Sequence, residues 1–586
     1  MAKAEATWTK TVEGVLKNIN DVLSSYGLIE KDSSLLSNVK DRDYKQQMVA
    51  ARSDLEQELI ASGGSGMLLT KERKEVIAYK PTDLLQKLRE GSISAVLVLQ
   101  SYQAMAIEES KRTNCVTEFI PDAKRWAESL DAVKLGQMSD VTLPLHGLPV
   151  SVSDNISIEG LDCSLGLRKR LRQPADHDAV IVQVIKRLGA IPFVKTNTAQ
   201  LCLSPGCSNP VWGETVHPID PTRASGGASG GEAALIAGGG SMLGLGTDIS
   251  GGLRTPAGWC GTVSLKPTAK RLSSKGCVSA IDPLGIHSTV GVMGRDSSIV
   301  VEAIKAILSA DFHQYEAELA PLPWNDALYI GKAKKSLRIG FFDSIEILPS
   351  TLGVKRAVRD VVNLCKEQGH DVIHFSPPEL EEGLDLFMAL LMADQGHSVH
   401  PLLKGEIVDS GLAWYKQCAA VPPHLRHLAK PLIRRQFGDI VANHSLGSLY
   451  SIADLWKKLA ERQEYCNRFL LAWKKEELDL LVCPVFPSPA ALKEHCGKLT
   501  IACLPTLLFN LLDYPVATVP VCRQTQDDET NIDKYEATDY IHELLKESGA
   551  GAEGLPLSVQ IVALPYSEEL LCRAVGEITE HLNFKL

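Results

Sequence analysis

The sequence predicts an α/β fold in which one large domain has a mixed central β-sheet surrounded by helices. From about residue 80 onward, short apolar runs typical of buried strands alternate with amphipathic helical segments. The chain has 586 residues, of which 45% are hydrophobic and 23% are charged, so it can bury a large core. We find no internal repeat. We therefore expect residues 80–586 to form this domain and residues 1–79 to form an N-terminal helical extension.

Two amphipathic helices are predicted in the extension. Residues 8–26 place an apolar stripe on one helical face, formed by Val12, Val15, Leu16, Ile19, Leu23 and Tyr26. Residues 43–61 repeat the pattern with Tyr44, Met48, Ala51, Leu55 and Leu59. The glycine-rich stretch 62–66 (SGGSG) predicts a turn after the second helix. The simplest arrangement is a hairpin packed on the main body, and binding to a partner or a membrane surface is the alternative.

The alternating pattern also places the elements of the main domain. Strands are expected at residues 147–154, 191–196, 337–342 and 478–486. Helices are expected at residues 177–190, 232–239 and 354–369, and glycines mark their ends. The segment 523–553 is acidic and has Gly and Ala at its tip, which predicts a surface excursion.

Bulk composition narrows the classes of function. The net charge is −10 and no basic stripe is present, so we expect no nucleic-acid partner. No apolar run reaches the roughly 18 residues that a membrane span needs. The first residues lack the apolar core of a signal peptide, so we expect a cytoplasmic protein that is not secreted. The 14 cysteines form no CxxC pair, and no histidine cluster accompanies them, so we expect reduced thiols and no metal or other cofactor.

Three motifs stand in order along the chain: GLPVSVSDN (147–155), ASGGASGGEAALIAGGG (224–240) and GLGTDISGGLRTPAGWCGTVSLKPT (244–268). Together they resemble the amidase signature family. Further stretches resemble the fatty acid amide hydrolases within that family, namely TNCVTEF (113–119), CSNPVWGETVHP (207–218), LPWNDALY (322–329) and GLPLSVQIVALPYSEEL (554–570). The resemblance covers roughly residues 80–586 and implies hydrolysis of amide or ester bonds.

The resemblance also implies a mechanism, and this chain departs from it at three positions. In the family a serine attacks the carbonyl, a second serine relays its proton, and a neutral lysine acts as the base. Ser153 stands where the lysine is expected, Ala228 where the relay serine is expected, and Gly252 where the nucleophile is expected. Ser250 stands where the family has a glycine.

Other positions of the site match the family. Asp248 and Arg254 are implied to tie the turn to its surroundings. Ser229 also matches, and the resemblance implies a cis peptide at Gly227. The backbone N–H groups that would stabilise an oxyanion are implied to come from Ile249, Ser250, Gly251 and Gly252.

The three replacements favour a pseudoenzyme that keeps the fold and either binds lipid amides or acts as a scaffold. The alternative is a hydrolase of fatty acid amides or esters with a relocated nucleophile, for which Ser250 and Cys260 are the candidates. Such a hydrolase needs a base from another position, for example Lys195 or His146. In a third interpretation, the protein uses only the surface of the fold, as an assembly module.

Ligand binding is implied by resemblance at a few further positions. An apolar acyl channel would include Cys202, Leu391 and Met392, although an ordinary core position is the alternative for each. The expected ligand is an N-acyl lipid or another small amide.

A segment at residues 422–441 predicts a peripheral membrane contact. Its apolar face consists of Leu425, Leu428, Leu432, Ile433 and Phe437, and its positive charges are Arg426, Lys430, Arg434 and Arg435. A solvated surface helix or a dimer contact is the alternative. The resemblance implies a homodimer.

Overall fold

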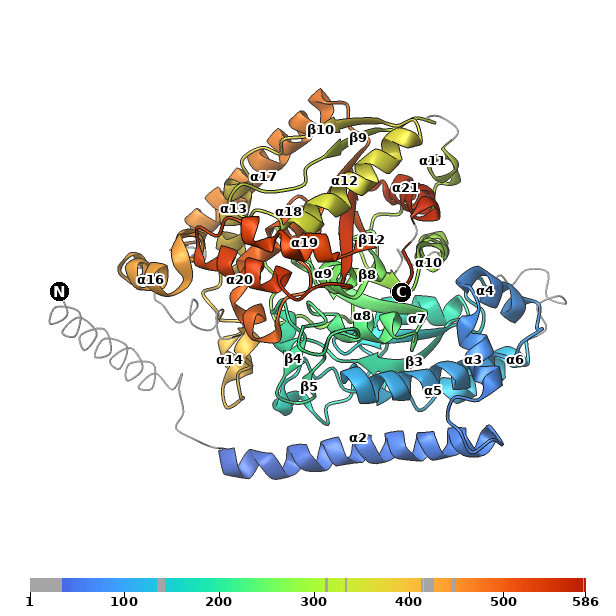
Figure 1. Cartoon of the computed structure of the whole chain (residues 1–586). Helices are drawn as coiled ribbons and strands as arrows, with labels where there is room; N and C mark the ends of the chain where they lie inside the picture. Colours follow the sequence, from blue (N-terminus) through green and yellow to red (C-terminus); the bar gives the residue numbers. More distant parts are fainter. Residues whose placement is uncertain are drawn as a thin grey trace.

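A mixed β-sheet of eleven strands crosses the molecule, and helices surround it (Figure 1). We describe a computed structural model, which covers residues 34–133, 143–310, 315–331, 335–412, 415, 426–444, 449, 451–582 and 584–586. The predicted α/β fold with a mixed central sheet is confirmed.

The strands run across the sheet in an order that differs from their order in the chain. In sheet order they are β1 (Val116–Phe119), β3 (Ile191–Thr196), β2 (Pro149–Ser153), β6 (Leu243–Asp248), β8 (Thr289–Gly294), β7 (Val263–Lys266), β12 (Val516–Arg523), β13 (Pro556–Ala563), β11 (Leu480–Pro484), β9 (Arg338–Phe341) and β10 (Asp371–His374). Strand β2 is parallel to both β3 and β6, and β9 is parallel to both β10 and β11, whereas the other pairs are antiparallel. Strands β4 (Ser208–Asn209) and β5 (Gly213–Glu214) form a small separate sheet.

The helices of the first half of the chain are α2 (Ser34–Ser62), α3 (Lys71–Ala78), α4 (Pro81–Arg89), α5 (Ala95–Thr113), α6 (Ala123–Asp131), α7 (Val180–Arg187), α8 (Gly230–Ala237), α9 (Arg254–Cys260) and α10 (Ser297–Ser309). Those of the second half are α11 (Asp326–Ile330), α12 (Leu352–Glu367), α13 (Leu380–Leu391), α14 (His400–Leu403), α16 (Arg426–His444), α17 (Ile452–Lys475), α18 (Leu504–Leu511), α19 (Gln526–Thr530), α20 (Tyr540–Gly549) and α21 (Glu568–His581).

The strands and helices predicted for the main domain are all present. The expected strands correspond to β2, β3, β9 and β11, and β3 has the predicted bounds. The expected helices correspond to α7, α8 and α12. Each element is apolar on the side that faces one of two large clusters of buried side chains, so its burial follows the predicted pattern.

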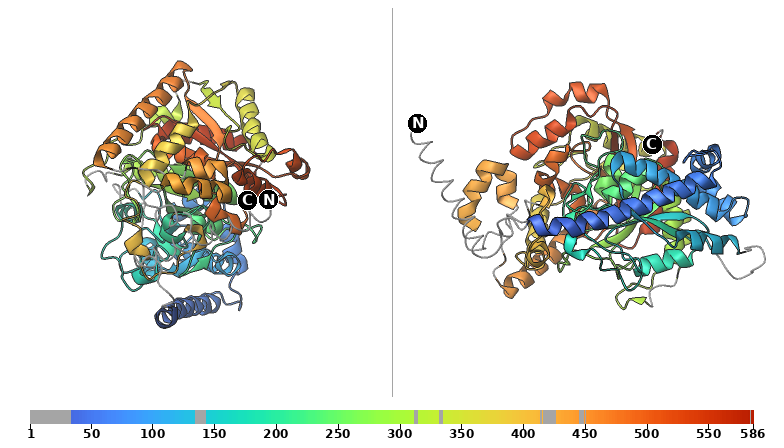
Figure 2. Two further views of the ribbon diagram at one scale, coloured as in Figure 1. Left: turned by 90° about the vertical axis from the view of Figure 1, so that its left-hand side faces the viewer. Right: turned by 90° about the horizontal axis from the view of Figure 1, so that it is seen from below.

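The N-terminal extension is described only from residue 34, so the predicted helix at 8–26 lies outside the described residues. The second predicted helix is confirmed as part of α2, which lies along the outside of the body (Figures 1 and 2). A turn follows it, with Gly64 and Gly66 at positive φ. Buried Arg73 of α3 then donates to the carbonyls of Leu59 and Leu68, both at 2.8 Å. The boundary at residue 79 stays a prediction.

The segment 523–553 is less peripheral than its acidic composition predicts. It contains α19 and α20, and α20 buries Ile541, Leu544 and Leu545 in the second apolar cluster. Apolar residues spaced three to four positions apart explain the difference, because they give a short amphipathic helix a face to bury.

Helix α16 covers most of the segment predicted to contact a membrane. Among its described side chains, Ile433 and Phe437 pack against the second apolar cluster, whereas Arg434 and Arg435 are exposed. Arg434 pairs with Asp439 at 2.5 Å. In the described part of the chain, no helix combines the length and apolarity needed to cross a membrane. The membrane contact and the homodimer stay predictions.

A buried ion-pair cluster fastens the loop after β7 to α21. Arg271 donates to Glu568 at 2.6 Å and to Glu569 at 2.7 Å, and all three side chains are at most 2% exposed. The neighbouring Lys270 makes a comparable contact with Glu318 at 2.7 Å, but that pair is exposed. Because a buried charge depends on its partner, loss of the buried contact lowers the free energy of unfolding more than loss of the exposed one.

We expect Arg271→Ala to lower the free energy of unfolding by about 3–5 kcal/mol, because it leaves two buried carboxylates without a counter-charge. Lys270→Ala is the matched control and is expected to leave the midpoint of urea unfolding nearly unchanged. Equal midpoints for the two variants would show that the buried cluster does not stabilise this junction.

Candidate active-site cavity

The turn between β6 and α9 is held in place by a buried carboxylate at the end of β6. Asp248 accepts hydrogen bonds from the backbone N–H groups of Gly251 at 2.8 Å and Leu253 at 3.1 Å. Gly251 has φ +113°, and a Cβ there would lie 2.5 Å from the Thr506 hydroxyl. Only glycine therefore fits this position of the turn.

Arg254 completes the anchor, as the sequence predicts. It pairs with Asp248 at 2.8 Å, and both side chains are 0% exposed. Its guanidinium also donates to the Thr506 carbonyl at 2.8 Å, to Gln560 at 2.9 Å and to Asn510 at 2.6 Å, so that the turn is linked to α18 and β13. Burial alone would raise the pKa of Asp248. Arg254 and the hydrogen bonds that the carboxylate accepts outweigh burial, and the pKa lies well below its usual range.

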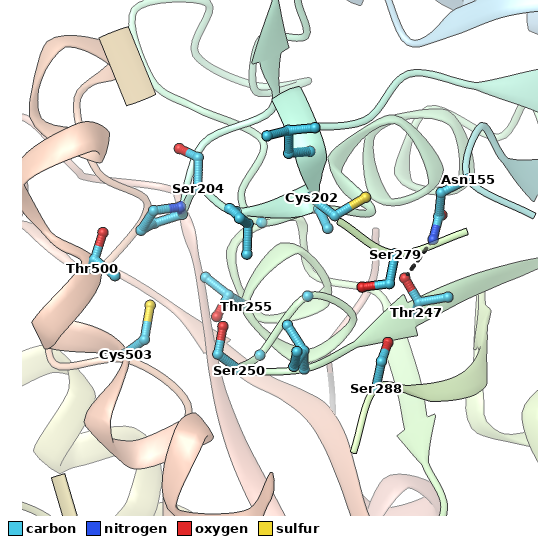
Figure 3. A pocket seen from close by; sticks show the side chains of 18 of the residues that line it. Asn155, Cys202, Ser204, Thr247, Ser250, Thr255, Ser279, Ser288, Thr500 and Cys503 are labelled. Carbon is cyan, nitrogen blue, oxygen red and sulfur yellow. Dashed lines mark hydrogen bonds between the residues drawn. The ribbon is translucent and has the colours of Figure 1, made fainter. Parts of the chain in front are cut away.

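A cavity of about 50 Å³ lies against this turn (Figure 3). Of the site residues predicted from the sequence, those that line it are Cys202, Ala228, Ile249, Ser250, Gly251, Gly252 and Leu391. The other three do not line it. Ser153 and Ser229 are fully buried with unpartnered hydroxyls, and Met392 belongs to the second apolar cluster.

The turn offers unused hydrogen-bond donors. Within the described residues, the backbone N–H groups of Ile249, Ser250 and Gly252 have no acceptor. The N–H of Gly251, which the resemblance implied as a fourth donor, is already bonded to Asp248. The side-chain oxygens of Asn155 and Thr255 also line the cavity and are buried without a partner. The site can therefore both donate to and accept from a bound polar group.

Among the residues that the structure describes, no strong base lines the cavity. Among the described residues, its lining contains no Asp, Glu, His, Lys or Arg. Burial raises the pKa of the thiols of Cys202 and Cys503 to about 12, and it raises the pKa of Tyr415 as well. None of these groups takes a proton from a serine hydroxyl near neutral pH.

The bases considered from the sequence are also engaged or placed elsewhere. Lys195 is fully buried, and its Nζ donates to the carbonyls of Asp154, at 2.9 Å, and Asp162. Burial works to lower the pKa of Lys195, but nearby negative charges outweigh it and raise the pKa. His146 lies outside the cavity lining, and burial lowers its pKa.

Cys260 is a poor nucleophile in this position. It is fully buried, does not line the cavity, and its thiol donates to the Ser225 carbonyl at 3.3 Å. Burial raises its pKa well above the usual value, which lowers the thiolate fraction that nucleophilic attack requires. The fold therefore places the Cys260 thiol in the core and away from the cavity, which argues against Cys260 as a relocated nucleophile.

The backbone at Gly252 leaves no room for a side chain. A Cβ there would lie 2.6 Å from the Thr247 carbonyl oxygen and 3.3 Å from the Ala228 Cβ. The implied cis peptide is also wrong, since every described peptide bond is trans, and Gly227 instead has φ +38°. A serine at residue 252 would require the turn to shift.

Several lining residues were not among the site residues predicted from the sequence. They include Asn155, Ser279, Ser288, Tyr415, Thr500 and Cys503. Asn155 ends the first motif, which is a signal that could have found it, and its Nδ2 donates to Thr247 at 3.0 Å (Figure 3). The others carry no local pattern, because only the packing of distant loops brings them to the turn.

Comparisons with known proteins agree with this geometry. The family model described as Amidase matches residues 97–572. The chain is 34% identical to fatty-acid amide hydrolase 1 of Sus scrofa, with 86% of each chain covered. It is 32% identical to fatty acid amide hydrolase 1 of Caenorhabditis elegans, with 90% of this chain and 92% of the relative covered.

Similarity of fold extends over nearly the whole chain. A solved fatty acid amide hydrolase superposes with a TM-score of 0.76 at 22% identity, covering 98% of this chain and 95% of the other. A 6-aminohexanoate cyclic dimer hydrolase in complex with substrate superposes with a TM-score of 0.66, covering 87% and 98%. The matched family model and the two relatives establish that this chain belongs to the amidase signature family.

Proposed function

We propose that this protein is a non-catalytic member of its family that binds a small amide, the head group of an N-acyl lipid included, without cleaving it. The proposal rests first on the residues at three positions. Ser153, Ala228 and Gly252 stand where the family resemblance expects the lysine base, the relay serine and the nucleophile. None of the three can perform that role.

The observation that carries the proposal is the lack of a proton acceptor among the described residues that line the cavity. A serine nucleophile needs a neighbouring base. Loss of one residue from a catalytic set of nucleophile and base lowers the rate by a factor on the order of 10⁴ to 10⁶. Stabilisation of the oxyanion by backbone donors would then accelerate the reaction only about 10³–10⁴-fold over the reaction in water. At such a residual rate, amide cleavage is negligible.

The free polar groups support an amide as the ligand. The N–H groups of Ile249, Ser250 and Gly252 can donate to its carbonyl oxygen, and the Asn155 carboxamide oxygen can accept from its N–H. The cavity has about a third of the volume of an engineered cavity that holds benzene, near 150 Å³. It therefore suits the amide group, and a long acyl chain requires Leu391 to move. The names of the two relatives indicate fatty acid amides as the class of ligand to test first.

The alternative function is hydrolysis of fatty acid amides or esters by a relocated nucleophile. Ser250 is the remaining candidate, because its side chain lines the cavity and its hydroxyl has no partner among the described residues. Its weakness is the missing base. A reagent that reports activated serines separates the two functions.

We expect the natural protein to show no labelling by a fluorophosphonate probe, because no lining group activates a hydroxyl. The measurement is in-gel fluorescence beside a catalytically active serine hydrolase. Labelling that disappears in Ser250→Ala and persists in Ser279→Ala, a matched change in the same cavity, would contradict the proposal and establish the relocated nucleophile.

Leu391→Trp is expected to abolish binding of butyramide and oleamide, because the larger side chain fills a cavity of about 50 Å³. Leu471→Trp is the matched control, since Leu471 is exposed on α17. Calorimetric titration without detergent measures both. No saturable binding of either amide to the natural protein at tens of micromolar would remove the ligand proposal, whatever the outcome of the probe experiment.

Gly252→Ala is expected to lower the free energy of unfolding by about 1–3 kcal/mol, because its Cβ meets a backbone carbonyl. A Cβ at Gly576 in α21 would have no neighbour within 4 Å. We expect Gly576→Ala to raise the free energy of unfolding by up to about 1 kcal/mol, because Ala has the higher helix propensity. The two urea midpoints should therefore move in opposite directions. A Gly252→Ala variant as stable as the natural protein would show that the turn still has room for a nucleophile.

A further inference from the structure

Helix α2 is attached to the body along its length by ion pairs between exposed or partly exposed side chains. Glu56 pairs with Lys111 of α5, Glu58 with Lys124 of α6, and Asp43 with Arg172, each at 2.6 Å. Close apolar packing is concentrated at its C-terminal end, where Leu59 is buried with residues of α5. The middle of α2 is thus held near the body without being packed tightly against it.

A cavity of about 680 Å³ lies between α2 and the body, on the side of the helix that faces α5. Figure 1 shows α2 running along the lower edge of the body. Its walls come from α2, α5, β1 and the loops around residues 160–162 and 172–174. It shares no lining residue with the cavity at the β6–α9 turn. Its volume is in the range of small-molecule sites, roughly 300–1,000 Å³.

One buried carboxylate in this cavity has no partner among the described residues. Glu118 of β1 lines it and is only 8% exposed. Within the described chain it makes no hydrogen bond or ion pair. Lys195 lies opposite it in the β1–β3 register, but the Lys195 ammonium donates to two backbone carbonyls instead. A buried carboxylate without a donor is unfavourable, so the site is incomplete as it stands.

The two other buried acidic groups nearby are already satisfied. Asp162 accepts from the backbone N–H groups of Arg172 at 2.6 Å and Gln173 at 2.8 Å. Asp154 accepts from Ser164 at 3.0 Å and from the Leu165 N–H at 2.8 Å. The one ammonium close to Glu118 and these two carboxylates, that of Lys195, donates to backbone carbonyls. The cavity lining also carries three cations, but Arg52 donates to Ser110, and Lys124 and Arg172 pair with Glu58 and Asp43. Asp54 of the lining is exposed, so Glu118 is the buried carboxylate left to receive a cation.

The uncharged part of the lining is amphiphilic. Met48 and Leu55 of α2 face Leu99 of α5 across the cavity, next to Phe119 and Ile120. Gln103 and Tyr44 add neutral polar groups, and the phenol of Tyr44 lies within reach of Asp162. An apolar wall beside one unpaired carboxylate suits a molecule with a cationic end and a hydrocarbon body.

We propose that the cavity beneath α2 is a second binding site, which takes a small amphiphilic amine with its ammonium group on Glu118 and its hydrocarbon body against Met48, Leu55 and Leu99. Burial raises the pKa of Glu118 to about 7 although Lys195 opposes it, which agrees with a carboxylate that lacks a donor. A ligand with a carboxylate head group would be repelled by Glu118. A neutral alcohol would gain the apolar contacts alone.

The test compares n-octylamine with n-octanol, which have the same chain and different head groups, by calorimetric titration of the full chain. We expect octylamine to bind at one site at least tenfold more tightly than octanol. Glu118→Gln should reduce octylamine affinity to that of octanol and leave octanol unchanged. Glu128→Gln, the same change at an exposed position of α6, should alter neither.

A second pair of variants keeps the test valid if Glu118→Gln disturbs the fold. Ala50 and Ala51 are both exposed on α2, but only Ala51 lines the cavity. We expect Ala51→Trp to abolish octylamine binding and Ala50→Trp to preserve it. Equal affinity for the amine and the alcohol, unchanged binding in Glu118→Gln, or no saturable binding, which would indicate a cavity filled by solvent only, would each overturn the proposal.

Discussion

The buried pair of Asp248 and Arg254 is the constraint on which the rest of the site depends. It joins the end of β6 to the start of α9 and extends through Arg254 to α18 and β13. Both charges are removed from water, so each needs the other, and loss of one partner from such a pair costs roughly 3–5 kcal/mol. The same carboxylate accepts backbone N–H groups of the turn, and it thereby decides which of them remain available to a ligand.

Under the proposed function, this division of the donors lets the scaffold of a hydrolase bind an amide without cleaving it. The turn needs backbone geometry, a buried ion pair and glycine at residue 251, and all three are present. Catalysis additionally needs side chains that attack and that carry protons, and the cavity lining offers hydroxyls without a base. A site with N–H donors and no base is suited to hold a carbonyl group, which is the basis of the proposed function.

The two cavities show how different parts of one fold can carry separate chemistry. The first is small, lies against the turn between β6 and α9, and has no charged residue in its described lining. The second is large, depends on α2, and contains an unpaired carboxylate. Because α2 is held partly by exposed ion pairs, ionic strength acts on the second cavity more than on the first.

The sequence by itself determined the fold class, most of the predicted strands and helices, and the identity of the residues in the three motifs. Periodicity succeeds there because it reports which face of an element is buried, and a motif is visible as letters. The replacements at Ser153, Ala228 and Gly252 can be read from the sequence alone. Only the tertiary structure decided which side chains meet. It buried Cys260, directed Lys195 toward backbone carbonyls, brought Tyr415 and Thr500 to the turn, and left Glu118 alone beneath α2. These outcomes depend on packing between segments far apart in the chain, about which local sequence patterns carry no information.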